Sequence, residues 1–265
     1  MKLSFSNIAW SSEYDEEMYI FLADNGYTGL EIAPTRLFPD RPPYEHIAEV
    51  QSFAENLYKK YGLTISSMQS IWYGKNESIF SFAEERQSLI EYTCKALDFA
   101  VVANCGNLVF GCPKNRNIPA GLDTVKAYKT AESFFKKIGW YAQKRDIVIS
   151  LEPNPAIYGT NFINRTEEAF TFVKSIDGIM VNIDCGTIIE NNENLEIINE
   201  NIKLVNHIHI SEPNLEIIKN RDLHKNLYRL LLENGYNRYV SVEMKDPGDI
   251  MVVKKIALYL KEIFG

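Results

Sequence analysis

Four acidic or histidine side chains stand near the carboxyl ends of four consecutive apolar segments in the second half of the chain. They are Glu152 in 147–153, Asp184 in 179–184, His209 in 204–210 and Glu243 in 239–244. A carboxylate inside an apolar segment must be paired, protonated or bound to a metal. Three carboxylates that met beside one imidazole would repel one another without a cation, and this donor set suits Mn²⁺, Mg²⁺ or Co²⁺. The pattern predicts a divalent-metal site, whereas the alternative is four unrelated side chains that arginines or water satisfy.

Two histidines alternate with isoleucines in the segment VNHIHISEP. Side chains two residues apart on a strand point the same way, so His207 and His209 share one face and Ile208 and Ile210 share the other. His209 is nearer the carboxyl end, so it is the better candidate for a metal ligand. His207 lies one layer deeper, where we expect a hydrogen bond that supports the site. The alternative is that both imidazoles form a polar edge that faces water.

The segments that must position these side chains are short, apolar and rich in β-branched residues. Eight of them recur at regular intervals: 3–9, 29–34, 63–69, 107–111, 147–153, 179–184, 204–210 and 239–244. Between them lie longer segments with the apolar spacing of helices. Eight strands that alternate with about eight helices are typical of a parallel α/β fold, and the number of strands and the length of 265 residues favour a closed (β/α)₈ TIM barrel.

The organisation of the chain is simple. We find no linker, low-complexity tract or long block of charge, so we interpret residues 1–265 as a single barrel domain. No glycine-rich phosphate loop follows the first predicted strand, as an open doubly wound sheet would usually show. In a barrel, catalytic groups lie on the loops at the carboxyl ends of the strands, which is where the four candidate ligands stand.

Composition excludes several classes of function. The formal net charge of −7 argues against a protein that holds nucleic acid through its phosphates. The four cysteines show no CxxC spacing, so neither a zinc knuckle nor a redox dithiol is indicated, and reduced thiols fit a cytoplasmic protein. No apolar run approaches the roughly 20 residues of a membrane span, and the first residues lack the pattern of a signal peptide. We therefore expect a cytoplasmic protein without membrane segments.

Several polar residues that follow the predicted strands are candidates for contacts with a substrate. Lys114 and Arg116 follow the fourth strand and could hold a phosphate or carboxylate, because Lys and Arg are the usual anion binders. The alternative for both is an ordinary solvated loop. Asn154 and Lys245 each stand two residues after a candidate ligand, on the same side of the chain. Asn154 could bind a hydroxyl, and Lys245 could act as an acid or contact the substrate, whereas the alternative for both is a plain structural role.

Three further candidates come from other strands. Glu31 stands in the second strand and could reach the site, and His207 could contact the substrate from beneath the predicted metal. Trp72 follows the third strand and could form the wall against one face of a sugar. Packing in the aromatic core is the alternative for this tryptophan.

Together these residues resemble a known family. The spacing of Glu152, Asp184, His209 and Glu243 resembles the metal site of the xylose-isomerase-like superfamily of sugar and sugar phosphate isomerases and epimerases. The resemblance covers essentially the whole chain, including GYTGLEIAP at the second strand and GYNRYVSVEM before the eighth. Ketose 3-epimerases, hydroxypyruvate isomerases, inosose dehydratases and the endonuclease IV group share this barrel.

The resemblance implies a cofactor, a reaction and a partner. The four residues would bind one divalent ion, Mn²⁺, Mg²⁺, Co²⁺ or Zn²⁺, and the chain would be a metal-dependent isomerase or epimerase with a small carbohydrate substrate. Glu152 and Glu243, on opposite faces of the substrate, would exchange the proton next to the carbonyl through an enediolate. Relatives of this kind often form dimers or tetramers, so the resemblance also implies a homodimer or homotetramer.

Two positions differ from particular members of the superfamily. Ketose 3-epimerases carry a histidine three residues after the sixth-strand aspartate, where this chain has Thr187, so the substrate need not be an ordinary free ketose. Endonuclease IV needs further histidines on its early strands for three zinc ions, where this chain has Gln69. The alternatives are a dehydratase of the inosose type, an endonuclease IV-like phosphodiesterase, and a binding protein that keeps the barrel without the metal.

Overall fold

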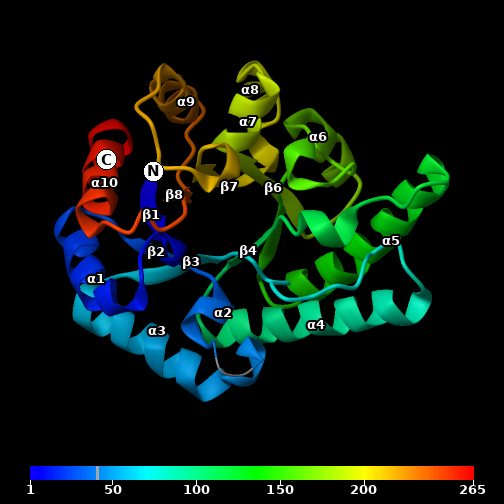
Figure 1. Ribbon diagram of the computed structural model, residues 1–265, viewed down its shortest axis with the longest axis horizontal. Helices are drawn as coiled ribbons and strands as arrows, with labels where there is room; N and C mark the ends of the chain where they lie inside the picture. Colours follow the sequence, from blue (N-terminus) through cyan, green and yellow to red (C-terminus); the bar gives the residue numbers. More distant parts are fainter. Residues whose placement is uncertain (40–41) are drawn as a thin grey trace.

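The barrel predicted from the sequence is present. A computed structural model describes residues 1–39 and 42–265 (Figure 1). Within these ranges, parallel strands close into one barrel in the order of the sequence, and β8 pairs with β1. The strands are β1 (Lys2–Ser6), β2 (Gly29–Ile32), β3 (Thr64–Met68), β4 (Asn107–Phe110), β5 (Val148–Leu151), β6 (Ile179–Asp184), β7 (Val205–Ile210) and β8 (Tyr239–Val242). Each lies within one of the eight predicted segments or overlaps most of it, so the closed (β/α)₈ fold is confirmed.

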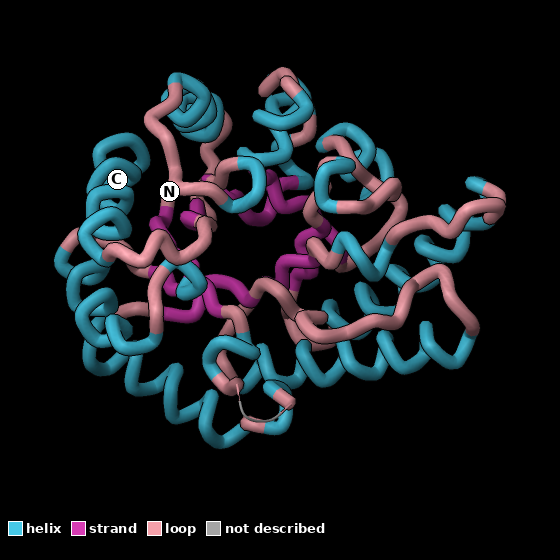
Figure 2. Tube along the Cα trace, in the orientation of Figure 1, coloured by secondary structure: helices cyan, strands magenta, loops and turns pink. Residues whose placement is uncertain are grey.

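The helices form a ring outside the strands (Figure 2). They are α1 (Asp15–Asp24), α2 (Pro34–Leu37), α3 (Ile47–Tyr61), α4 (Ala83–Val102), α5 (Thr124–Gln143), α6 (Thr166–Val173), α7 (Cys185–Asn191), α8 (Glu196–Glu200), α9 (Asp222–Glu233) and α10 (Ile250–Phe264). The short helices α2, α7 and α8 are additions to the longer segments that apolar spacing predicts. Among the helices of the described residues, none is long and apolar enough to cross a membrane.

Alternation along the strands separates a polar lumen from an apolar outer layer. In β6 and β7, Asn182 and Asp184 point into the barrel beside their register partners His207 and His209. The isoleucines between them are fully buried on the other side of the strands, toward the helices. The strands therefore bring polar groups into the lumen while their outer faces complete the hydrophobic core.

The amino-terminal half of the lumen is filled by small polar side chains that bond to one another. Ser4 Oγ lies 2.6 Å from Ser66 Oγ. Asn107 donates a hydrogen bond to Ser67 Oγ at 3.0 Å and accepts one from Ser150 Oγ at 2.6 Å. Because buried polar groups are costly unless they are paired, this network gives the barrel a satisfied base below its carboxyl-terminal mouth.

Candidate metal and catalytic site

The four residues predicted to bind a metal come together at the mouth of the barrel. Glu152 follows β5, Asp184 ends β6, His209 lies in β7 and Glu243 follows β8. One donor atom from each lies within 4.8 Å of the others. All four side chains are buried, with Glu152 and Glu243 exposing 9% and 8% of their surface. Adjacent parallel strands end at the same height, which is why residues separated by some 30 positions in the sequence become neighbours.

His209 connects the two carboxylates that lie farthest apart around the barrel. Its Nδ1 atom lies 3.0 Å from Glu152 Oε1 and 3.1 Å from Glu243 Oε2. Its Nε2 atom lies 2.9 Å from Oε2 of Glu31, a residue of β2. A carboxylate only accepts hydrogen bonds, so Nε2 donates its proton to Glu31 and Nδ1 is directed at the acidic cluster. Histidines that bind metals commonly donate their second ring N–H to a carboxylate in this way.

Glu31 supports two imidazoles at once. His207 Nε2 donates to the same Oε2 atom of Glu31, at 3.0 Å. Among the described residues, Glu31, His207 and His209 form a second group whose donor atoms are close enough to hold an ion. His209 belongs to both groups, however, and a neutral imidazole offers a lone pair on only one of its nitrogens. The fully buried Glu31 group is therefore better explained as hydrogen-bonded support beneath the cluster at the mouth.

Asp184 is held by the first turn of α7. Its Oδ2 atom accepts hydrogen bonds from the backbone N–H of Thr187 at 2.7 Å and from Thr187 Oγ1 at 2.8 Å. Its Oδ1 atom accepts from Ser211 Oγ, which also accepts from the N–H of Gly186. The aspartate is thus the N-cap of α7, and its carboxylate is fixed before any ion binds.

Glu152 is fixed from two sides. Asn182 donates to its Oε1 at 2.7 Å, and Asn154 donates to its Oε2 at 3.0 Å. Arg116 in turn donates to Asn154 Oδ1 at 2.6 Å and to the backbone carbonyl of Glu152 at 2.7 Å. A methyl group at Gly111 would lie 2.7 Å from Glu152 Oε2, so only glycine leaves space for the carboxylate.

The electrostatics of the cluster call for a cation. Burial raises the pKa of Asp184 to about 6, and the charge of Glu152 adds to this effect. Burial also raises the pKa of Glu243 to about 7, although His209 opposes it. For Glu152, hydrogen bonds and the charge of His209 outweigh burial and lower the pKa. The pKa of His209 lies well above its ordinary value, because the charges of Glu31 and Glu243 overcome burial. Crowded carboxylates that resist losing their protons fit a site for a divalent ion.

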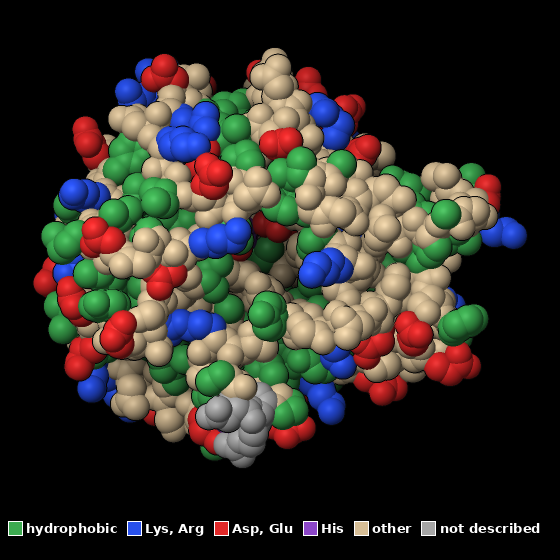
Figure 3. Space-filling view, viewed as in Figure 1, with side chains coloured by type: hydrophobic (Ala, Val, Ile, Leu, Met, Phe, Trp, Pro, Cys, Tyr) green, Lys and Arg blue, Asp and Glu red, His purple; other side chains and the backbone are tan. Residues whose placement is uncertain are grey.

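Two adjoining cavities lie at the cluster. The inner cavity, of about 180 Å³, is lined by Glu152, Asp184 and Glu243 together with Asn154. The outer cavity, of about 780 Å³, is lined by Lys114, Lys245 and Trp72 among others. Figure 3 shows this hollow at the centre of the molecule, with acidic atoms inside it and Lys or Arg side chains around its rim.

Three of the predicted substrate contacts do not reach these cavities. Arg116, Glu31 and His207 are buried at 0–1% exposure and are absent from the described residues that line either cavity. Arg116, predicted on a solvated loop or in a substrate cradle, instead positions Asn154. Trp72 lines the outer cavity, but its Nε1 donates to Thr93 Oγ1 at 2.9 Å and its ring centre lies 4.7 Å from that of Phe110, so most of it packs in the core.

Several residues of the site were missing from the sequence prediction. Asn182 and Ser211 each stand two positions from a predicted ligand, so the alternation that joined His207 to His209 could have found them. Tyr158 lines both cavities, and Gly111 makes room for Glu152. The last two are placed by loop geometry, for which the sequence holds no comparable signal.

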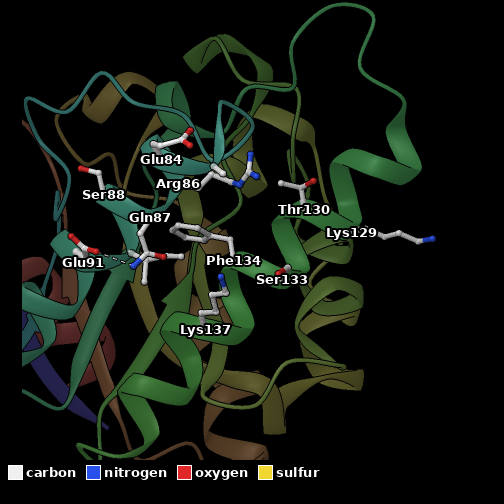
Figure 4. Close-up of a pocket in the computed structure, with 12 residues that line it drawn as sticks. Glu84, Arg86, Gln87, Ser88, Glu91, Lys129, Thr130, Ser133, Phe134 and Lys137 are labelled. Carbon is white, nitrogen blue, oxygen red and sulfur yellow. Dashed lines mark hydrogen bonds between the residues drawn. The ribbon is translucent and has the colours of Figure 1, made fainter.

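A cavity of about 790 Å³ lies outside the barrel, between α4 and α5 (Figure 4). Its wall mixes Glu84 and Glu91 with Arg86, Lys129 and Lys137. No histidine occurs among the described residues that line it, and the acidic cluster lies elsewhere, at the mouth of the barrel. We therefore assign the chemistry to the mouth and not to this groove.

Comparisons with known proteins agree with the fold. The D-psicose 3-epimerase of Clostridium cellulolyticum H10, solved with D-tagatose, has a TM-score of 0.79 and 17% identity over 100% of this chain and 99% of its own. The 3-keto-D-glucoside 4-epimerase YcjR of E. coli has a TM-score of 0.77 and 19% identity over 99% of each chain. The family 2 AP endonuclease of Brucella melitensis has a TM-score of 0.73 and 16% identity over 100% of this chain and 96% of its own.

These identities are low, so the structural matches show the fold alone. A search of curated proteins returned no significant match. Family membership rests on the sequence itself, because residues 20–263 match the sequence model of one family along almost the whole barrel. The chain belongs to the xylose isomerase-like TIM barrel family.

Proposed function

We propose that this chain is a divalent-metal-dependent isomerase or epimerase of a small sugar or sugar derivative. The observation that carries the proposal is the arrangement of two carboxylates around one imidazole nitrogen. Glu152 and Glu243 face the same inner cavity from β5 and β8, and both lie about 3 Å from His209 Nδ1. Two carboxylates on different sides of a small cavity can remove and return a proton at one carbon.

The residues would divide the work as follows. A divalent ion held by Glu152, Asp184, His209 and Glu243 would supply a positive charge that stabilises an enediolate. One glutamate removes the proton next to the substrate carbonyl, and the other delivers a proton to the opposite face. Asn154 and Asn182 keep the carboxylate of Glu152 in place during the transfer. The small inner cavity limits the water that could compete for these protons.

The similar structures support the same class of reaction. Two of them are named as epimerases of carbohydrates, a D-psicose 3-epimerase and a 3-keto-D-glucoside 4-epimerase. The AP endonuclease shares the barrel, but a cluster of three zinc ions would need more histidines at the mouth. Of the four histidines in the sequence, all of them described, only His209 belongs to the cluster there.

The first test joins metal content to proton exchange. The purified wild-type protein and the Asp184→Ala variant are analysed for bound metals. We expect one divalent ion per chain in the wild-type protein and much less metal in the variant. The Mn²⁺-loaded protein is then incubated in D₂O with a panel of ketoses, aldoses and their phosphorylated and carboxylated derivatives. We expect a product of unchanged formula that has gained deuterium next to the carbonyl.

Matched variants make this test specific. Glu152→Gln and Glu243→Gln should abolish epimerisation, whereas Glu200→Gln, on the exposed surface of α8, should leave it unchanged. A product that has lost water would replace the epimerase with a dehydratase. Three zinc ions per chain would favour phosphodiester hydrolysis, and protein without metal after supplementation would refute the proposal.

A further inference from the structure

The two cavities at the mouth have opposite charge. We infer that Lys114 and Lys245 form an anion subsite that binds a phosphate monoester at the end of the substrate that lies away from the acidic cluster. This inference rests on the proposed function, because it assigns the substrate class of the same site. It concerns different residues, however, and can be tested without turnover.

The cavities adjoin each other. Ser70, Cys112, Tyr158 and Leu215 line both of them, so the outer cavity is the space next to the inner one at the mouth of the barrel. The inner cavity is small, at about 180 Å³, and the outer one is wider, at about 780 Å³. A substrate longer than its reacting carbons would therefore place its other end in the outer cavity.

The charges change sign between the two cavities. Three carboxylates line the inner cavity, and none of its described lining residues is a Lys or Arg. The outer cavity has three lysines, Lys75, Lys114 and Lys245, and no Asp or Glu among the residues described along its wall. This cationic surface stands out in a chain with a net charge of −7. A ligand complementary to both has metal-binding oxygens at one end and an anion at the other.

Two of the lysines are available to an anion. Lys75 is partly neutralised by Glu77, whose Oε1 atom lies 3.4 Å from its Nζ. Lys114 and Lys245 are exposed, and within the described part of the chain neither side chain has an ion-pair partner. Asp246, next to Lys245, accepts a hydrogen bond from the N–H of Gly248 in its own turn. The loops therefore leave two ammonium groups directed to the cavity and to solvent.

The two lysines reach the outer cavity from different loops. Lys114 follows β4 and Lys245 follows β8, and these strands lie on opposite sides of the eight-stranded barrel. The backbone N–H of Lys245 donates to the carbonyl of Leu215 at 2.9 Å, which ties its loop to the preceding one. Because both side chains line the outer cavity, an anion there has one cation on the loop after β4 and another on the loop after β8.

The chemistry favours a phosphate over a carboxylate. A phosphate monoester carries about −1.5 to −2 charges at neutral pH and three acceptor oxygens, which match two or three separate ammonium groups. A planar carboxylate is better recognised by the fork of an arginine. The arginine nearest in sequence, Arg116, is fully buried and bonded to Asn154 and to the carbonyl of Glu152. Among the described residues that line it, the outer cavity therefore offers the point charges of lysines and no guanidinium fork.

The test compares matched sugars and matched lysines. Mn²⁺-loaded protein is assayed on D-fructose and D-fructose 6-phosphate, on D-ribulose and D-ribulose 5-phosphate, and on D-fructuronate. The variants are Lys114→Met, Lys245→Met and their combination. Lys129→Met is the control, since Lys129 is also exposed and lines a cavity of similar volume between α4 and α5 (Figure 4). Binding of glycerol 3-phosphate, measured by calorimetry, gives a readout that requires no turnover.

We expect the wild-type protein to prefer the phosphorylated sugar of each pair in kcat/KM. Each single variant should reduce that preference by about tenfold, which is the effect of one charged hydrogen bond. The reduction should come from a higher KM for the phosphorylated sugar. The double variant should lose glycerol 3-phosphate binding. Lys129→Met should behave as wild type in both measurements. Both lysine positions are exposed, so these variants are expected to fold.

Each result separates this inference from the proposed function. Equal or greater activity on the free sugars, unchanged in the lysine variants, would overturn the phosphate subsite and leave the epimerase in place. A lysine-dependent preference for D-fructuronate would replace phosphate with carboxylate and would also overturn the assignment. No turnover of any sugar, with lysine-dependent binding of glycerol 3-phosphate, would support the subsite and refute the proposed function. Neither turnover nor lysine-dependent binding would refute both.

Discussion

Glu31 offers a direct test of how the protein prepares His209 for a metal. One oxygen of this carboxylate, Oε2, accepts from His209 Nε2 at 2.9 Å and from His207 Nε2 at 3.0 Å. The other oxygen, Oε1, has no hydrogen-bond partner among the described residues. A glutamine placed with its carbonyl at Oε2 can keep both hydrogen bonds, so Glu31→Gln removes the negative charge and places an NH₂ group at the buried Oε1 position.

The expected loss in metal affinity is moderate. Partners of this kind, which bond to a metal ligand without touching the metal, typically contribute 10–100-fold to affinity. We therefore expect Glu31→Gln to weaken Mn²⁺ binding by about 30-fold, or about 2 kcal/mol. Glu31→Ala should weaken it further, because both imidazole N–H groups then lose their acceptor in a fully buried place.

The assay is titration calorimetry with Mn²⁺ at pH 8, where protons compete less for the imidazole than at neutral pH. Glu193→Gln is the matched control, because the side chain of Glu193 is also buried, at 5% exposure, and accepts from Thr166 N and Asn191 Nδ2 away from the cluster. An affinity of Glu31→Gln within twofold of wild type would refute the reasoning. So would a weakening of equal size in Glu193→Gln, since it would reflect general destabilisation.

A second readout needs no metal. The charges of Glu31 and Glu243 hold the pKa of His209 well above its ordinary value despite burial. Removing one of these charges in Glu31→Gln should lower the pKa of His209 in metal-free protein, as NMR titration of the ring protons would show. An unchanged pKa would mean that Glu31 does not act on His209 through its charge, whether or not the cluster binds an ion.

Three further predictions concern the residues around the cluster. In metal-free protein the free energy of unfolding should fall as the pH rises from about 4.5 to 7, because the pKa values of Glu243 and Asp184 are about 7 and 6 in the folded protein and 4.5 and 3.8 in the unfolded chain. Denaturation series at several pH values would measure this fall, and saturating Mn²⁺ should remove the dependence on pH. Gly111→Ala should reduce Mn²⁺ affinity and turnover at least tenfold with a small change in Tm, because its methyl group would displace the Glu152 carboxylate; wild-type affinity would contradict this. Thr187→Val should lower the free energy of unfolding by about 1–2 kcal/mol in urea denaturation, because the lost hydroxyl lies 2.8 Å from an oxygen of Asp184. Thr187→Ser keeps a hydroxyl and should retain most of the wild-type stability.

The barrel could be predicted because its signal is periodic. Eight apolar segments at regular intervals correspond to β1 to β8, and the alternation of side chains places Asp184 and His209 in the lumen. Parallel strands then bring their carboxyl ends to one level. From the order of the strands alone, Glu152 and Glu243 are expected beside these two residues, and the structure has them there.

The roles of single residues were harder to predict, because they depend on contacts between distant segments. Glu31 lies 176 positions from His207, and their bond crosses the barrel from β2 to β7. Arg116 looks like an exposed cation in the sequence, yet its loop turns inward and it ends fully buried against Asn154. The need for glycine at position 111 appears only when the carboxylate of Glu152 is in place. Periodicity within one segment contains none of this information.

The interior of the barrel explains how a cluster of acids can be buried at its mouth. Serines and asparagines fill the lower lumen and satisfy one another, as Asn107 does with Ser67 and Ser150. At the next level, Glu31 accepts from both His207 and His209, so its negative charge faces two donors. His209 then turns its other nitrogen to the carboxylates above. The lower layer thus pairs groups within itself, the Glu31 layer supports His209, and the carboxylates at the mouth lie where an ion and a substrate can reach them.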